Sequence, residues 1–375
     1  MTRFNVFACL LPLVLFTACT VPSTKNEATR AAPSPAAKAL RAQLDQQTAQ
    51  WLKQFDVPSV AIAYIENGRL AWTAVYGEQS PGVPANEKTL YNLASLTKPI
   101  SAEVILRLAS KGALSLDEPM FPYWVDPDIK DNPWARLLTP RLCLTHQTGF
   151  KNWRRQSKGV LAFQWEPGTR TGYSGEGYDY VGRFAEKKTG RPFEELAQEY
   201  VFDPIGMKDT AYTKRDWFIG RIAEPHGPKG ETAPKDDGTW SGADLVRTTV
   251  GDYAKFLLSV TRREGLTHEI ADQQMVSTRN TVPADELAKA CAKAGVTADA
   301  CHGSAGLGLG WEIIDVNGTT VFDHGGSDWG VRTQVYFDPK KQTGAVILTN
   351  GDNGRDVIRK VVGVLYPDPL FMATL

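Results

Sequence analysis

Residues 59–76 read SVAIAYIENGRLAWTAVY, and this stretch gives the clearest indication of the fold. Two runs rich in β-branched and aromatic residues, 59–66 and 69–76, flank the dipeptide Asn67-Gly68. Asn-Gly favours the tight two-residue turn of a β-hairpin, because both positions tolerate a positive φ. The pattern therefore predicts a pair of antiparallel strands near the start of the folded chain.

The segments around this hairpin predict a mixed architecture. Helical periodicity precedes it over 36–55, and strand patterns return late in the chain before a closing helix over 355–365. The late strands are expected at 309–316, 319–323, 331–338 and 343–350, and the intervening helices at 97–111, 178–189, 193–202, 250–260 and 284–293. This order predicts an α+β fold, with one antiparallel sheet built from both chain ends, flanked by helices, beside a mainly α region.

The composition is that of a globular protein. The 375 residues include 42 Lys+Arg and 42 Asp+Glu, and 42% are hydrophobic. A chain of this length buries a sufficient core without a disulfide scaffold. Because the formal net charge is zero, the protein has no net positive potential that would attract a polyanion. We therefore expect a small-molecule or peptide substrate and no nucleic acid partner.

The first residues have the pattern of an export signal. Arg3 precedes an apolar run over 4–16 that is too short to span a bilayer, and Leu15-Phe16-Thr17-Ala18-Cys19 resembles a bacterial lipobox. We expect residues 1–18 to be a signal peptide and Cys19 to be lipidated; a plain secretory signal cut nearby is the alternative. Residues 19–38, rich in Ala, Pro, Ser and Thr, are expected to form a flexible tether. The folded part would then face the periplasm as a lipid-anchored protein, at the outer membrane in a Gram-negative cell.

The remaining cysteines fit an oxidising compartment. Cys291 and Cys301 are close enough in sequence to close a short disulfide loop, with two unpaired thiols as the alternative, whereas Cys143 in an apolar context is expected to be a buried free thiol. No pair of cysteines or histidines has the spacing of a metal site, so we expect neither a metal nor another cofactor.

A candidate nucleophile lies at the start of the helix predicted over 97–111. In Ser95-Leu96-Thr97-Lys98-Pro99, Ser95 and Lys98 share one helix face if the helix begins at Ser95. Pro99 is tolerated only in a first turn, which supports this start. A serine beside an amine suits nucleophilic catalysis. Because S-x-x-K also arises by chance, the motif alone is weak.

Two further segments can contribute to the same site. Tyr173 lies in a glycine-containing loop before a helix, and its hydroxyl could point into a cleft; an aromatic residue packed on a turn is the alternative. His324-Gly325-Gly326-Ser327 precedes a strand, where paired glycines let a substrate backbone approach and the Ser327 N–H could donate to an oxyanion. A simple glycine turn would explain this second segment equally well.

Together these motifs resemble the penicillin-recognising serine hydrolases, which include class C β-lactamases, D,D-carboxypeptidases, D-aminopeptidases and related esterases. The resemblance spans about residues 43–366 and rests on the joint order of several segments. These are 92–98 (NLASLTK), 144–150 (LTHQTGF), 166–168 (EPG), 173–174 (YS), 203–207 (DPIGM) and 324–326 (HGG). The resemblance implies a β-lactamase/transpeptidase-like fold with the active site in the crevice between the α/β part and the all-α part.

The resemblance also implies roles for the site residues. Ser95 would attack a carbonyl, Lys98 and Tyr173 would relay its proton, and the N–H groups of Ser95 and Ser327 would form the oxyanion hole. Whether neutral Lys98 or ionised Tyr173 is the base stays open. We expect His324 to replace the third-motif lysine of the family, as a donor to Tyr173 or to a substrate carboxylate and with a titration near pH 6.5.

Two departures from the family pattern bear on the substrate. Gly175 stands where the family usually has the Asn that binds the acylamide of β-lactams, and His324-Gly325-Gly326 stands in place of Lys-Thr-Gly. These changes favour esters, D-amino-acid peptides or cell-wall-derived amides over efficient β-lactam hydrolysis. The alternative is a penicillin-recognising sensor or binding lipoprotein without turnover.

The sequence thus predicts a single hydrolase domain over 39–375, with its α/β part at 39–95 and 303–375 and a mainly α insert over 96–302. We expect it to act as a monomer, on a substrate that includes peptidoglycan fragments among its candidates. His146 is expected to hold a loop together rather than to act in catalysis.

Overall fold

The computed structural model describes residue 1 and residues 32–229, 231, 238–276, 278, 284–293, 295–297, 301, 304–316 and 318–375. Residues 2–31, which contain the predicted signal peptide and Cys19, lie outside this set. None of the helices in the described part is both long and apolar enough to cross a membrane.

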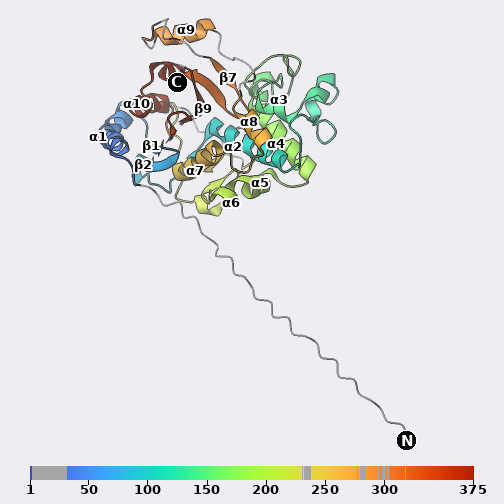
Figure 1. Ribbon diagram of the computed structural model, residues 1–375, viewed down its shortest axis with the longest axis horizontal. Helices are drawn as coiled ribbons and strands as arrows, with labels where there is room; N and C mark the ends of the chain where they lie inside the picture. The colour runs from blue at the N-terminus through green and yellow to red at the C-terminus, as the bar shows by residue number, and fades with distance from the viewer. Residues whose placement is uncertain are drawn as a thin grey trace. The chain divides into compact units, whose positions relative to one another are not determined.

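An eight-stranded antiparallel sheet forms the centre of the fold (Figure 1). Its strand order is β3-β2-β1-β11-β10-β9-β8-β7, so strands from the two ends of the folded chain meet at the β1–β11 pair. The strands are β1 Ser59–Glu66, β2 Arg69–Ser80, β3 Val83–Pro84, β7 Ala305–Leu307, β8 Glu312–Val316, β9 Thr319–Asp328, β10 Val331–Asp338 and β11 Thr343–Thr349. The predicted α+β class and the sheet from both chain ends are confirmed.

Helices cover both faces of this sheet. On one face lie α1 (Pro35–Phe55), α10 (Gly354–Leu365) and α11 (Pro369–Thr374), and α7 (Val250–Thr261) packs on the other face against β1, β2 and β11 (Figure 1). Strand β1 shows why two layers are possible. Val60, Ile62 and Tyr64 point to the α1 and α10 side, and the alternate residues, including Ala61 and Ile65, point to the other side.

The middle of the chain is mainly helical, as predicted. It contains α2 Thr97–Ser110, α3 Pro140–Leu144, α4 Gly175–Thr189, α5 Phe193–Ala197, α6 Asp203–Ile205, α8 His268–Gln274 and α9 Ala284–Lys293, with short 3-10 turns, a π-turn over Gln198–Phe202 and a small sheet of β4 (Tyr91–Asn92), β6 (Arg247–Thr248) and β5 (Thr210–Ala211). One of the 3-10 turns, η1 (Ala94–Leu96), immediately precedes α2.

Three predicted boundaries are wrong for physical reasons. Helix α1 begins at Pro35, capped by Ser34, so residues 35–38 are helical and not part of a tether. Helix α4 begins at Gly175 instead of residue 178, because Ser174 caps it by accepting a hydrogen bond from the Gly177 N–H. The strand predicted from residue 309 begins at Glu312, because the chain turns at Gly308 and Gly310, where φ reaches 94° at Gly310.

The cysteines are placed as predicted. A disulfide joins Cys291 to Cys301, with 6.0 Å between their Cα atoms, and Cys143 is a buried free thiol.

Strand β9 is longer than predicted and is open on one side near its end. Its pairing with β8 ends at Asp323, whereas its pairing with β10 continues to Asp328. Residues 324–328 therefore have β10 on one side and turn η1 close to the other. The side chain of Thr333 on β10 reaches across and donates to the Leu93 carbonyl at 2.8 Å.

Two adjacent glycines of β9 differ in how closely η1 approaches them. A Cβ on Gly326 would lie 2.6 Å from the backbone oxygen of Leu93, a contact that only a backbone shift can relieve. A Cβ on Gly325 would meet the end of the flexible Gln334 side chain at 3.3 Å. We expect Gly326→Ala to destabilise the protein by about 2 kcal/mol and Gly325→Ala to stay within about 0.5 kcal/mol of wild type.

Thermal unfolding of both variants, followed by circular dichroism, checks this prediction. Equal melting temperatures for the two variants would show that β9 and η1 are not in tight contact.

Candidate active site

Ser95 and Lys98 are in direct contact at the start of α2. The Lys98 ammonium donates to Ser95 Oγ at 3.0 Å. Helix α2 begins at Thr97, as the range 97–111 predicted, and Ser95 lies just before it in η1, so the two side chains meet although the helix does not begin at Ser95. The reason is local: Ala94 has a φ of +48° and donates its N–H to the Asn92 side chain, so the chain makes a tight turn before it becomes helical. Pro99 lies in the first turn of α2, as expected.

Lys98 is fully buried. Its second acceptor is the backbone carbonyl of Ala243, at 2.9 Å. Burial lowers the pKa of Lys98 from its ordinary 10.5 to about 8, against the opposing attraction of more distant acids such as Asp244 and Glu312. A substantial fraction of the side chain is therefore neutral near physiological pH and able to accept a proton.

Tyr173 completes the cluster that the motifs predicted. Its ring centroid is 4.8 Å from Lys98 Nζ. Burial raises the pKa of the Tyr173 phenol, and the nearby Ser95 hydroxyl only partly offsets this. Of the two bases that the sequence left open, burial therefore favours neutral Lys98 over ionised Tyr173 in the free protein.

His146 packs against the ring of Tyr173. The two rings stack with centroids 4.3 Å apart, and the N–H of Ser174 donates to His146 Nδ1 at 3.0 Å. Burial holds the pKa of His146 well below its usual range, so the imidazole is neutral. His146 holds the Tyr173 loop in place, in agreement with the loop role expected from the sequence.

His324 lies on β9, with its ring centroid 6.4 Å from that of Tyr173. Its Nδ1 is 2.8 Å from the Gly325 carbonyl oxygen, which can only accept, so Nδ1 carries the proton and Nε2 is unprotonated in the neutral ring. Burial, with Lys98 nearby, lowers the pKa of His324 to about 3. The expectation of a donor that titrates near pH 6.5 is therefore wrong: neutral His324 can only accept at Nε2.

The oxyanion candidates lie where β9 meets η1. Gly326 packs on Leu93 and Ala94, immediately before Ser95, and Ser327 follows it with an exposed side chain. This contact brings the backbone of Ser327 and that of Ser95 to the same junction. Their role as paired N–H donors remains a prediction.

Gly175 is explained by the side chain that occupies the space beside it. A Cβ at this position would lie 2.7 Å from the indole of Trp153, whose ring centroid is 5.9 Å from Lys98 Nζ. Trp153 therefore takes the volume that a larger residue at 175, such as the family's asparagine, would need. Sequence reasoning missed Trp153, because nothing in its local sequence marks it as part of the site.

The loop over 239–246 was also missed. It supplies the Ala243 carbonyl to Lys98, and Asp179 fixes the loop by accepting hydrogen bonds from Ser241 Oγ and the Gly242 N–H, both at 2.8 Å. A backbone acceptor has no side-chain signature, so no sequence signal could have indicated it.

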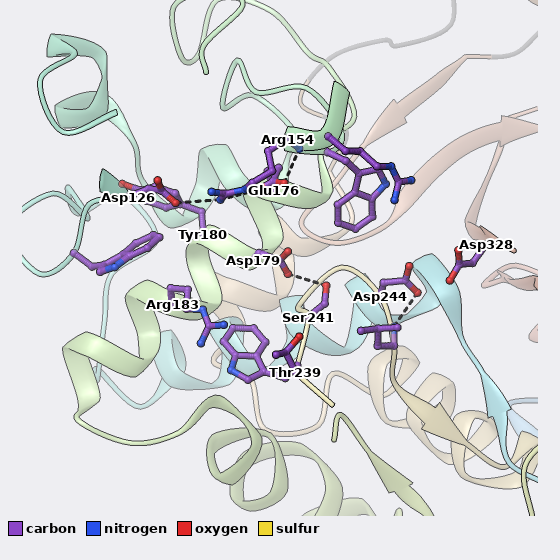
Figure 2. Close-up of a pocket in the computed structure, with 15 residues that line it drawn as sticks. Asp126, Arg154, Glu176, Asp179, Tyr180, Arg183, Thr239, Ser241, Asp244 and Asp328 are labelled. Carbon is purple, nitrogen blue, oxygen red and sulfur yellow. Dashed lines mark hydrogen bonds and ion pairs between the residues drawn. The ribbon is translucent and has the colours of Figure 1, made fainter. Parts of the chain in front are cut away.

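No group of three or more His, Cys, Asp or Glu side chains in the described part of the chain is placed to hold a metal ion. Trp153 and Asp244 are among the residues that line a cavity of about 450 Å³. Figure 2 shows Asp244 in its wall.

The chain is similar to several known proteins. Penicillin-binding protein 4 of Amycolatopsis lactamdurans is 22% identical over 85% of this chain and 92% of its own length. Esterase EstB of Burkholderia gladioli is 27% identical over 48% of this chain and 53% of its own length. The crystal structure of D-alanine carboxypeptidase AmpC from Burkholderia cenocepacia has the same fold, with a TM-score of 0.67 at 21% identity over 88% of this chain and 100% of that one.

The family model named Beta-lactamase matches residues 40–363. This match covers most of the chain and includes every residue of the Ser95, Lys98, Tyr173 and His324 cluster. The chain therefore belongs to the beta-lactamase family, whose members include serine hydrolases named as esterases, carboxypeptidases and β-lactamases.

Proposed function

We propose that this protein is a serine acyl-enzyme hydrolase that acts on an ester, a D-amino-acid peptide or a cell-wall-derived amide. The observation that carries the proposal is the contact of Ser95 Oγ with Lys98 Nζ at 3.0 Å, in a position where burial lowers the pKa of Lys98 to about 8. A nucleophile with a base of matched pKa is the minimum that acyl transfer requires.

The two steps follow from this geometry. Neutral Lys98 takes the Ser95 proton as Oγ attacks the substrate carbonyl, and the resulting oxyanion is held at the junction of η1 and β9. As the bond to the leaving group breaks, that group takes the proton held by Lys98 through the Tyr173 hydroxyl, which leaves an acyl-Ser95 ester and a neutral amine. Water, deprotonated by the same amine, then attacks the ester carbonyl, and the proton passes from Lys98 to Ser95 Oγ as the acid is released.

The substrate range is proposed from Gly175 and Trp153. Trp153 fills the space beside Gly175, so the acylamide contact that favours β-lactams in relatives with asparagine has no counterpart at this position. This supports esters and D-peptides over efficient β-lactam turnover. We also propose that the protein is anchored to the cell envelope, and this proposal rests only on the lipobox that ends at Cys19.

The Ser95→Ala variant tests the proposed chemistry. We expect it to lose turnover of p-nitrophenyl acyl esters and D-alanyl peptides by at least about 10³-fold and to lose labelling by a fluorophosphonate, because the covalent intermediate cannot form. Ser80→Ala, at the end of β2 and outside the site, is the matched control and should retain both.

Two other outcomes have distinct meanings. Labelling of Ser95 by fluorescent penicillin or fluorophosphonate with no release of product would favour the sensor alternative. Equal turnover and labelling in wild type and Ser95→Ala would contradict the serine mechanism.

The pH dependence identifies the base. Because the pKa of Lys98 is lowered, its neutral form increases as pH rises, and kcat/KM for a neutral ester should rise about tenfold per pH unit up to an inflection near 8. His324→Gln should keep the same inflection, because the pKa of His324 is about 3 and its charge does not change in this range.

Initial rates between pH 6 and 10, corrected for spontaneous hydrolysis, provide the measurement. A rate that still rises tenfold per pH unit at pH 10, with no inflection, would assign the base to Tyr173, whose pKa burial raises. An inflection near 6.5 that disappears in His324→Gln would restore the titrating-histidine hypothesis.

A further inference from the structure

The cavity of about 450 Å³ is lined by residues that adjoin the catalytic cluster, and not by Ser95, Lys98, Tyr173 or His324 themselves. Trp153, which fills the space next to Gly175, is one of its lining residues. Asp244 is another, and it directly follows Ala243, the residue whose carbonyl accepts from Lys98. A group bound in this cavity would therefore contact residues that themselves adjoin Lys98.

Several charged residues in the wall neutralise one another. Arg154 forms ion pairs with Asp126 at 3.0 Å and with Glu176 at 2.9 Å, and Arg183 pairs with Glu186 outside the cavity at 3.0 Å. Arg155 is exposed, with its guanidinium 5.5 Å from the Trp153 ring centroid. These arginines therefore already have partners within the protein.

Asp244 and Asp328 are different. They lie at one end of the cavity with their carboxylates turned toward each other (Figure 2). Each accepts one hydrogen bond from the backbone N–H of the next residue, at 2.8 Å from Leu245 and 2.7 Å from Trp329. Neither forms an ion pair with any basic side chain in the described part of the chain, and Asp244 Oδ2 accepts no hydrogen bond there.

Two facing carboxylates, neither of which forms an ion pair within the described residues, favour a positively charged guest. Burial, together with the negative charge of Asp328, raises the pKa of Asp244 to about 7, and a cation between the two would remove this repulsion. The indoles of Trp124, Trp153 and Trp240 also line the cavity and provide apolar surface for a carbon chain. The rings of Trp153 and Trp240 already have cationic partners, because Arg155 and Arg183 lie 5.5 and 4.3 Å from their centroids. Carboxylates combined with indoles suit an ammonium group on a carbon chain better than a bare metal ion.

We propose that this cavity is the acyl-group subsite and that it binds a substrate ammonium group between Asp244 and Asp328, with the tryptophans around its carbon chain. The preferred substrates would then be esters or amides of amino acids with a free amine. This inference rests on the proposed serine hydrolase function and narrows its substrate class.

Pairs of thioesters in which NH₃⁺ replaces CH₃ test the inference. D-Alanyl is compared with isobutyryl, and 3-aminopropionyl with butyryl, as thiobenzyl esters whose released thiol is measured. We expect kcat/KM to favour the amine by about tenfold or more in at least one pair, because a hydrogen bond to a charged group is worth that much. The ratio should fall to near one in Asp244→Asn and in Asp328→Asn.

Asp356→Asn is the matched control, because Asp356 is an exposed acid on α10, and it should keep the wild-type ratio. Binding of the same compounds to Ser95→Ala, followed by tryptophan fluorescence, measures the subsite without turnover. Circular dichroism confirms that each variant is folded.

The outcomes separate the two proposals. No amine preference in either turnover or binding, or a preference that both Asp244→Asn and Asp328→Asn retain, would overturn the subsite and leave the hydrolase standing. Amine-selective binding that depends on both carboxylates, with no Ser95-dependent turnover of any thioester, would support the subsite and overturn the proposed chemistry.

Discussion

The burial of one amine is the constraint on which the rest of this site depends. Lys98 has no exposed surface, and within the described residues it contacts two oxygen acceptors and no carboxylate. The lowering of its pKa from 10.5 to about 8 corresponds to about 3 kcal/mol of lost preference for the charged form. A neighbouring carboxylate would stabilise the ammonium and leave it unable to accept a proton. The site avoids this by giving Lys98 a serine hydroxyl and a backbone carbonyl.

The fold meets this constraint with elements from distant parts of the chain. Turn η1 and α2 carry Ser95 and Lys98, the loop before α4 carries Tyr173, and the loop over 239–246 carries the Ala243 carbonyl. Strand β9 closes the arrangement, because its pairing with β8 ends at Asp323 and leaves its last residues next to η1. Gly326 allows this approach, since any Cβ there would collide with the Leu93 carbonyl.

Burial favours the uncharged form of every titratable group in the cluster. It favours neutral Lys98, neutral His146, neutral His324 and protonated Tyr173. Above about pH 8 the catalytic centre is therefore close to uncharged, and below it the only charge of these four groups is that of protonated Lys98, whereas Asp244 and Asp328 place negative charge at the end of the adjacent cavity. Proton transfer would then take place at Lys98, whereas Asp244 and Asp328 in the adjacent cavity would recognise a charged group of the substrate.

Much of the fold and the principal side chains of the site were predictable from the sequence by itself. Alternation and Asn67-Gly68 identified the first hairpin, helical periodicity identified α2 and α7, and Pro99 restricted where the helix bearing Lys98 could start, because these patterns reflect hydrogen bonds and sterics within a few residues. Ser95, Lys98 and Tyr173 were identified by their joint order along the chain. The tertiary structure alone decided that Ala243 supplies an acceptor 145 residues from Lys98, that Trp153 fills the space beside Gly175, and that His324 is neutral. Protonation and shape depend on which remote atoms exclude water from a group, and only the folded chain brings those atoms together.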